Sequence, residues 1–288
     1  MAKMRAEEVL RAEGINSLPV DLFLIAKNHE ILIRAKPDCA YGVSGMLLRH
    51  GDTFGILFAT HINNEGFQRF CIAHELGHYF LEGHIDQVLK SAHASNAGHF
   101  SSDPYEQEAD SFASSLLMPA IPFRKSVGKF AEGLQAVIGL ANLCGTSLSA
   151  TAIRYAELTE DAVAVIVSTG QKVDYAVLSD LMKKSLPGLS WPVKGSKISG
   201  RTLTSTFNEN SARVLSADQD VIPDTDIQEW LGGDHSSPAM EEVIGLGSYG
   251  KTLTVLTCLS LQDETYKDDD EEDEDSLIDS WTPRFHKR

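Results

Sequence analysis

The order of apolar and polar residues at the start of the chain predicts two short helices. Residues 2–13 are rich in helix formers and end at Gly14, which is typical of a helix end. A second helix is expected from Ser17 to about His29, with Ser17 as its N-cap and Pro19 in its first turn.

Three segments rich in β-branched, aliphatic and aromatic residues follow, and they predict a small, mostly antiparallel sheet. They cover residues 31–35, 42–49 and 54–59, and a turn at 50–52 joins the last two. We expect 54–59 to be the strand nearest the next helix, where its edge could pair with an extended peptide.

Helical patterns return after this sheet, and strands dominate the last third of the chain. Helices are expected from Asn63 or Asn64 to about Gly83, from Tyr105 to Met118 with Asp103 as N-cap, and over 132–143 and 148–158. Strand-like segments are 162–167, 173–178 and 253–259.

These elements predict an α+β protein with four parts. Residues 1–130 are expected to form one domain of helices and a small sheet, and 131–160 a short segment that resembles a helix-turn-helix. Residues 161–262 form a C-terminal α+β domain, and 263–288 form an acidic tail whose apolar end docks on the body.

Composition places the chain among globular proteins of the cytoplasm. It has 288 residues, of which 42% are hydrophobic, and no apolar run approaches the ~20 residues of a membrane span. The N-terminus lacks the apolar core of a signal peptide. The four cysteines are scattered without Cys-x-x-Cys spacing, so neither a cysteine zinc site nor a disulfide framework is indicated.

The net charge of −16 comes mostly from one segment. Residues 263–279 contain eleven acids and one base, so that segment contributes −10 and the remainder −6. From 131 to 160 the only base is Arg154. Because phosphate contacts need Lys or Arg, we expect no direct nucleic-acid binding, and the helix-turn-helix-like segment is better interpreted as a brace for the core.

The sequence His74-Glu75-Leu76-Gly77-His78 carries the candidate chemistry. On a helix, residues four apart share a face, so His74 and His78 can bind one metal ion. Glu75 is offset around the helix and can reach a water on that metal without ligating it. This is the arrangement of a zinc peptidase, in which Glu75 would be general base and general acid. Together with this motif, the helices and small sheet of residues 1–130 predict a zincin-like domain.

A catalytic zinc site needs a third protein ligand, and two candidates exist. His84 has the spacing of the pattern His-Glu-x-x-His-x-x-Gly-x-x-His, but Leu81 stands where that pattern has its turn-forming glycine. The other candidate is Glu106, with Asp110 on the same helix face to orient a ligand histidine. We favour Glu106, and Glu108 on another face is a weaker candidate.

The oxyanion donor is not assigned by the sequence; Tyr79, Tyr105 and the other histidines are open alternatives. The segment 245–252 has the spacing of a phosphate-binding loop, Gly-x-x-x-x-Gly-Lys-Thr. A β-like segment follows it where such a loop needs a helix, so a glycine-rich turn is the better interpretation.

Residues 69–80 and 106–119 together resemble the ImmA/IrrE family of zinc metallopeptidase-like regulators, and segments near 18–26 and 141–154 fit the same family. The resemblance covers about 1–158. It implies a cytoplasmic zinc endopeptidase that cleaves a partner helix-turn-helix transcriptional repressor in a stress, mobile-element or toxin–antitoxin-like system. The alternatives are a non-proteolytic regulator that acts by partner binding, or a C-terminal ligand sensor with a vestigial peptidase.

Overall fold

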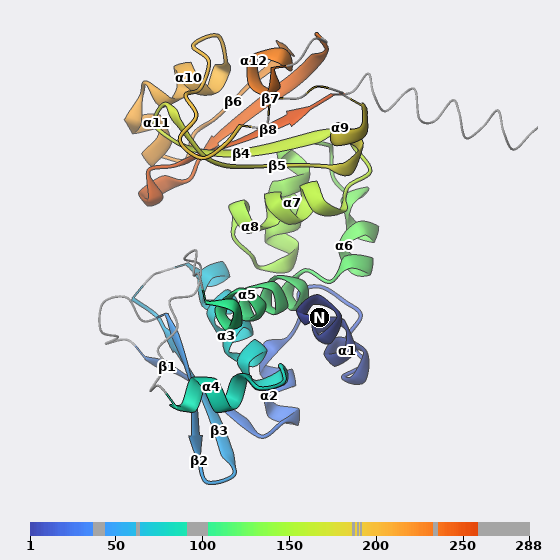
Figure 1. Cartoon of the computed structure of the whole chain (residues 1–288), viewed down its shortest axis with the longest axis vertical. Coiled ribbons are helices and arrows are strands. Elements are labelled where there is room, and N and C mark those ends of the chain that lie inside the picture. The colour runs from blue at the N-terminus through green and yellow to red at the C-terminus, as the bar shows by residue number, and fades with distance from the viewer. Residues whose placement is uncertain are drawn as a thin grey trace, which may run out of the picture. The chain divides into compact units, whose positions relative to one another are not determined.

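The computed structural model describes residues 1–36, 44–61, 64–90, 103–185, 188, 190, 192–232 and 236–258. The expected acidic tail and its docking end lie outside these residues. The chain forms two compact units, one from residues 1–131 and 135–155 and the other from 132–134 and 156 onwards (Figure 1). Both combine helices with a sheet, so the expected α+β class is confirmed.

The first unit contains three strands and most of the helices. Its elements are α1 (Ala2–Ala12), α2 (Leu22–Asn28), β1 (Ile31–Lys36), β2 (Gly45–His50), β3 (Thr53–Ala59), α3 (Glu65–Phe80), α4 (His84–Lys90), α5 (Pro104–Leu117) and α6 (Ala120–Val127), with most of α7 (Leu134–Cys144) and α8 (Leu148–Leu158).

The three-stranded sheet has the order β1-β3-β2, with β1 parallel and β2 antiparallel to β3. The expectation that residues 54–59 offer a free edge is therefore wrong, because β3 is paired on both sides. β2 and β1 are the edge strands. Helix α3 packs on β2 and β3, α5 packs on α3, and α1 packs on α5, which gives the layers seen in Figure 1.

Side-chain caps fix where the helices of the site begin. Asn64 accepts a hydrogen bond from the Phe67 backbone N–H at 3.0 Å and starts α3, and Asp103 accepts one from Tyr105 at 3.0 Å and starts α5. Both caps match the sequence prediction. The predicted cap of α2 is wrong: Asp21, not Ser17, begins that helix.

The turn between α7 and α8 packs against the start of α3. A Cβ on Gly66 would meet the backbone of Thr146 and Ser147, and one on Gly145 would meet the side chain of Arg69. Arg154 is buried, and its Nε donates a hydrogen bond to the Met118 carbonyl at 3.0 Å. The helix-turn-helix-like segment therefore supports the core, and its one arginine faces inward.

The second unit is built on a five-stranded antiparallel sheet of order β5-β4-β8-β7-β6. Its elements are β4 (Val163–Thr169), β5 (Lys172–Leu178), α9 (Asp180–Ser185), α10 (Leu203–Asn208), α11 (Ser211–Leu215), β6 (Gln219–Asp226), α12 (Gln228–Leu231), β7 (Pro238–Gly245), the 3-10 turn η1 (Gly247–Tyr249) and β8 (Thr252–Thr257).

Helix α10 is attached to one face of this sheet by buried hydrogen bonds. The carboxylate of Glu241 accepts bonds from the backbone N–H groups of Leu203 and Thr204, at 3.2 and 2.8 Å, and from the Thr204 hydroxyl at 2.7 Å. Thr204 also contacts the hydroxyl of Thr254 on β8 at 2.7 Å. Each buried polar group is thereby paired, which offsets its loss of water.

The glycine-rich segment 245–252 connects the antiparallel strands β7 and β8 through η1. A strand, not a helix, follows it, and Lys251 forms an ion pair with Asp174. The interpretation as a turn is confirmed. Among the described residues, no single helix has both the length and the apolar composition of a membrane span.

Candidate metal centre

Helix α3 carries three of the expected site residues into the interior of the first unit. His74, Glu75 and His78 are all fully buried. The two histidines lie one helical turn apart on one face, and their ring centroids are 4.7 Å apart. The surrounding residues of α3 are mainly apolar and buried.

A close approach of α3 and α5 brings the third residue to this pair. A Cβ on Gly77 would lie 3.2 Å from both the Cα and the carbonyl oxygen of Ala109, so a larger residue would push the helices apart. Glu106 lies on α5, about one turn before Ala109, and this places it next to the two histidines. It is only 7% exposed.

The donor atoms of His74, His78 and Glu106 converge on one point. The two Nε2 atoms are 3.0 Å apart, and the Glu106 oxygens lie 3.0 Å from His78 Nε2 and 3.5 Å from His74 Nε2. Donors bound to one tetrahedral zinc at ~2.0–2.1 Å are separated by about 3.3 Å. This buried His-His-Glu cluster is compatible with a metal site and has the donor types that zinc prefers.

Proton affinities show how strongly the cluster attracts positive charge. Burial lowers the pKa of His74, but hydrogen bonds to Asp110 and Glu106 outweigh it and raise that pKa to about 10. Burial lowers the pKa of His78, and protonated His74 lowers it further. Burial raises the pKa of Glu106, yet its bonds to both histidines hold it well below its usual range. Without a metal, the cluster therefore holds one proton more than two neutral imidazoles carry, and this extra proton lies on His74.

Asp110 occupies the position that the sequence predicts for it. Its Oδ1 lies 2.8 Å from Nδ1 of His74. A carboxylate accepts hydrogen bonds, so His74 keeps a proton on Nδ1. A metal ion that displaces the second ring proton then meets the lone pair of Nε2. One turn separates Asp110 from Glu106 on α5, which explains why both reach the same imidazole.

His84, the alternative metal ligand by spacing, lies outside the group of His74, His78 and Glu106. It is fully buried, and its Nδ1 lies 3.1 Å from Nδ1 of His78, on the far side from the cluster. Its Nε2 lies 3.1 Å from Oε2 of Glu108. Helix α3 ends at Phe80, and Gly83 with φ of +79° turns the chain so that His84 folds back onto His78.

Glu75 is buried against the edge strand β2. A Cβ on Gly45 would lie 2.6 Å from its Oε1, so the glycine leaves room for the carboxylate. The charge of Glu75 also contributes to the raised pKa of His74, which places the carboxylate beside the cluster. Tyr79 packs in an aromatic group with His29, Phe54 and Phe80.

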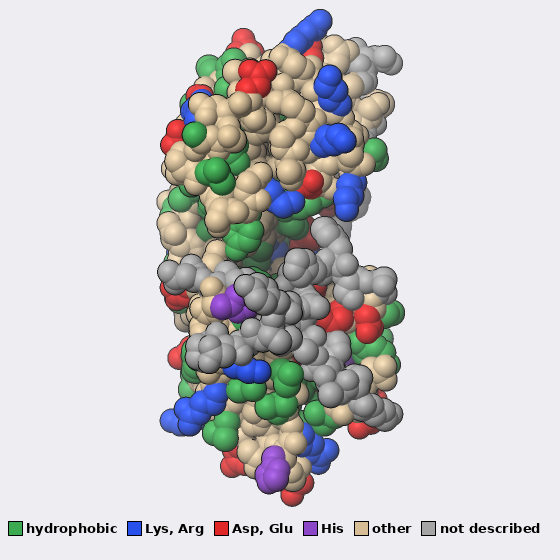
Figure 2. All heavy atoms as spheres, turned by 90° about the vertical axis from the view of Figure 1, so that its left-hand side faces the viewer, with side chains coloured by type: hydrophobic (Ala, Val, Ile, Leu, Met, Phe, Trp, Pro, Cys, Tyr) green, Lys and Arg blue, Asp and Glu red, His purple; other side chains and the backbone are tan. Residues whose placement is uncertain are grey.

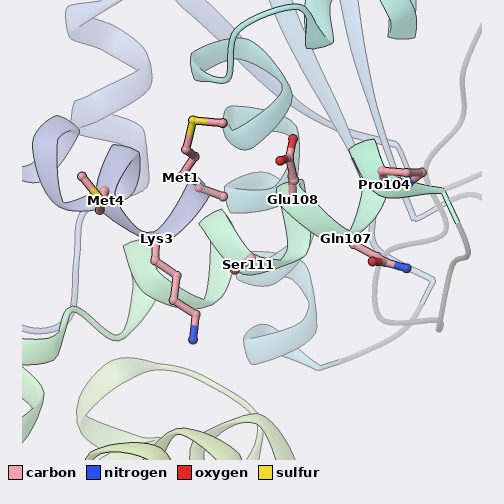
Figure 3. A pocket seen from close by; sticks show the side chains of 8 residues that line it. Met1, Lys3, Met4, Pro104, Gln107, Glu108 and Ser111 are labelled. Atoms are coloured by element: carbon pink, nitrogen blue, oxygen red, sulfur yellow. The ribbon is translucent and has the colours of Figure 1, made fainter.

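A surface pocket of about 470 Å³ lies near the site, between the start of α1 and the first turns of α5 (Figure 3). Glu108 lines this pocket, and its carboxylate points away from Gln107 and Pro104 in that view. Glu108 therefore links this pocket to the buried histidines: its carboxylate contacts His84, and His84 contacts His78.

The order of these residues along the chain matches a known family. The sequence matches the peptidase M78 family, described as the IrrE N-terminal-like domain, over residues 26–155. Residues 26–155 belong to this family. The matched range of the IrrE N-terminal-like domain contains His74, Glu75, His78, Glu106 and Asp110, together with His84 and Glu108.

Comparison with solved structures adds a likeness over both units. A Mycobacterium tuberculosis transcriptional regulator aligns with a TM-score of 0.54 and 14% sequence identity, covering 89% of this chain and 76% of the other. At this identity the likeness concerns the fold. A comparison with curated proteins found no match. The IrrE N-terminal-like domain suggests a metallopeptidase-like regulator.

Proposed function

We propose that this protein is a zinc-dependent endopeptidase, with zinc bound by His74, His78 and Glu106. The observation that supports the proposal is the buried three-donor cluster with Glu75 beside it. Glu75 lies on the helix that also carries His74 and His78. A purely structural metal site has four protein ligands, whereas a catalytic one has three and leaves a position for substrate. A glutamate next to an open metal position is the arrangement that peptide hydrolysis needs.

The role of each residue in the proposed reaction follows from its position. Bound zinc would supply Lewis acidity toward the scissile carbonyl. Glu75 takes the proton from the attacking water and passes it to the leaving amine, so one carboxylate serves as base and then as acid. Asp110 holds His74 in the tautomer that directs Nε2 inward. The buried surroundings keep bulk water away from these charges.

The edge of β2 is our candidate for holding the substrate main chain. Among the described residues, β2 is an edge strand of the sheet, and its residue Gly45 lies against Glu75. An extended peptide paired with this edge would pass the general base with its backbone groups hydrogen-bonded. This assignment replaces the edge of β3, which is covered by its neighbours.

The proposed substrate is a helix-turn-helix transcriptional repressor. The family of residues 26–155 and the transcriptional regulator of similar fold support a regulatory role. The inward position of Arg154 argues against direct DNA binding by α7 and α8. On the face drawn in Figure 2, several Lys and Arg side chains follow one side of the second unit, at the upper right of the view.

The test compares zinc-loaded wild type with Glu75→Gln. Each is incubated with repressors encoded beside its gene and with a proteome-derived peptide library, and new N-termini are identified by mass spectrometry. We expect cleavage by wild type and a loss of about 10²–10⁴-fold in Glu75→Gln, which cannot transfer the proton. Zinc content should be equal in both. If zinc-loaded wild type cuts neither the repressors nor the library, the peptidase proposal is wrong.

A further inference from the structure

His84 uses both of its ring nitrogens inside the first unit. Nδ1 contacts Nδ1 of His78 and Nε2 contacts Glu108, each at 3.1 Å. Its ring also meets Tyr105 edge-on, with centroids 4.9 Å apart. A buried imidazole with both nitrogens engaged is held in one orientation, so its protons are set by its two partners.

Glu108 decides which nitrogen of His84 carries the proton. Its side chain is 49% exposed and lines the pocket between α1 and α5, so water reaches the carboxylate and it acts as an acceptor (Figure 3). Nε2 of His84 must then donate. A neutral imidazole has one N–H, so Nδ1 of His84 is left with a lone pair and accepts a hydrogen bond.

The same reasoning passes from His84 to His78. Since Nδ1 of His84 accepts, Nδ1 of His78 must donate, and the lone pair of His78 lies on Nε2. Nε2 is the atom that lies 3.0 Å from both His74 Nε2 and Glu106. Glu108 thus directs the lone pair of His78 into the cluster through one intervening imidazole.

Nδ1 of His74 is also held as a donor, in this case by direct contact with the Asp110 carboxylate. The two histidines are therefore supported from different sides, one by a carboxylate and the other by an imidazole and a carboxylate in series. Carboxylate contacts of this kind fix the tautomer of a metal-binding histidine and raise its basicity.

We propose that His84 and Glu108 are positioning residues that hold His78 in its Nδ1–H tautomer and thereby strengthen metal binding. This inference rests on the proposed metal site. By spacing alone, His84 is a possible metal ligand and Glu108 a weaker candidate for the same role. The inference gives both residues a role outside the metal's own ligands.

The test measures the zinc dissociation constant of the full chain by competition with a chromophoric chelator. His84→Ala should bind zinc roughly 10–100-fold more weakly, as expected for loss of an outer-shell partner. His84→Asn should recover most of the affinity, because its amide oxygen can accept from His78 Nδ1. Glu108→Ala, which removes the acceptor, should weaken binding in the wild-type background but have no effect in His84→Asn, where the link to residue 108 is already lost.

His29→Ala is the matched control. His29 forms a His–Glu pair of 2.9 Å with Glu13 in the same unit and packs on the rings of Tyr79 and Phe80, beside α3. The His29→Ala variant should bind zinc with the affinity of wild type. If His84→Ala binds zinc as wild type does, or if His84→Asn is as weak as His84→Ala, the positioning role is wrong. Wild type that binds no zinc would overturn the metal site itself.

A spectroscopic readout is independent of affinity. In the zinc-loaded protein, long-range ¹H–¹⁵N spectra of the histidine rings should show His84 protonated at Nε2 and unprotonated at Nδ1. His84 protonated at Nδ1 alone would contradict the order of donors and acceptors from Glu108 to His78.

Discussion

Individual ring protons decide what the buried cluster can bind. His74 and His78 each present one nitrogen to Glu106 and the other to a partner outside the cluster. Because each outer partner can be satisfied by Nδ1–H, the two Nε2 atoms and a Glu106 oxygen face one another with a single further proton among them, on His74. Acceptors brought this close favour a cation between them, whether a proton or a metal ion.

Lower pH should weaken zinc binding. The raised pKa of about 10 means that His74 holds a proton below that pH in the metal-free protein, and zinc must displace it. The apparent association constant should therefore fall about tenfold per pH unit on going down from about pH 8.5 to about pH 7. Zinc titrations against a chelator of known proton affinity measure this slope. A constant independent of pH would show that His74 carries no such proton.

Gly45→Ala should impair catalysis while sparing the metal. The added Cβ would lie 2.6 Å from Oε1 of Glu75, so the carboxylate must move. Displacement of a reacting group by about 1 Å costs on the order of 10²-fold in rate. Peptide cleavage and zinc affinity are measured together, with Gly55→Ala on β3 as control because its nearest contact, the Leu32 carbonyl oxygen, is 3.4 Å away. Equal cleavage rates in both variants would contradict the positioning of Glu75 by Gly45.

At the scale of elements, the site is a contact between two helices that begin at side-chain caps. α3 supplies His74 and His78, and the first turn of α5 supplies Glu106. Gly77 allows these helices to approach at Ala109. A ligand in a first turn depends on the cap, since that turn has no earlier helical hydrogen bonds to hold it.

Asp103→Ala should therefore lower both stability and metal affinity. Loss of its 3.0 Å bond to the Tyr105 N–H should cost about 1 kcal/mol and fray the turn that holds Glu106. Asp21→Ala is the matched control, because Asp21 caps α2 with an equal 3.0 Å bond to Leu24 but supplies no ligand nearby. Urea unfolding and zinc titration are compared. If both variants bind zinc equally well, the cap of α5 does not position Glu106.

At the scale of the whole molecule, the candidate metal centre belongs entirely to the first unit. The second unit has its own sheet and core, in which β8 is buried along its length and β4 is buried except at its last residue. A ligand stabilises the part of a protein that binds it. Bound metal should therefore stabilise the first unit more than the second.

Removal of zinc by a chelator should lower the protection of backbone amides in α3 and α5 and leave β4 and β8 nearly unchanged. At free zinc of about 100 times its dissociation constant, the bound form gains about 2.7 kcal/mol. Hydrogen exchange followed by mass spectrometry resolves these segments. His78→Ala is the control and should show no change on adding chelator. A uniform loss of protection across both units would contradict this separation.

Prediction from sequence succeeded where local chemistry decides the outcome. The i, i+4 spacing of His74 and His78, and of Glu106 and Asp110, fixes a shared face on any helix, and the structure brings these four residues together. The caps Asn64 and Asp103 satisfy local backbone groups and needed no tertiary information. The glycine-rich turn at 245–252 was also indicated by the strand pattern after it.

The sequence by itself determined the donor types, their helical spacing and the family to which residues 26–155 are similar. Tertiary structure alone decided that β3 is central and β2 is the edge, because strand order depends on long-range pairing. It also decided that His84 folds back through Gly83 to join His78 and Glu108, since a ring's partners depend on where separate helices pack. Spacing could place His84 near the metal, but only the packed helices could show which nitrogen faces which neighbour.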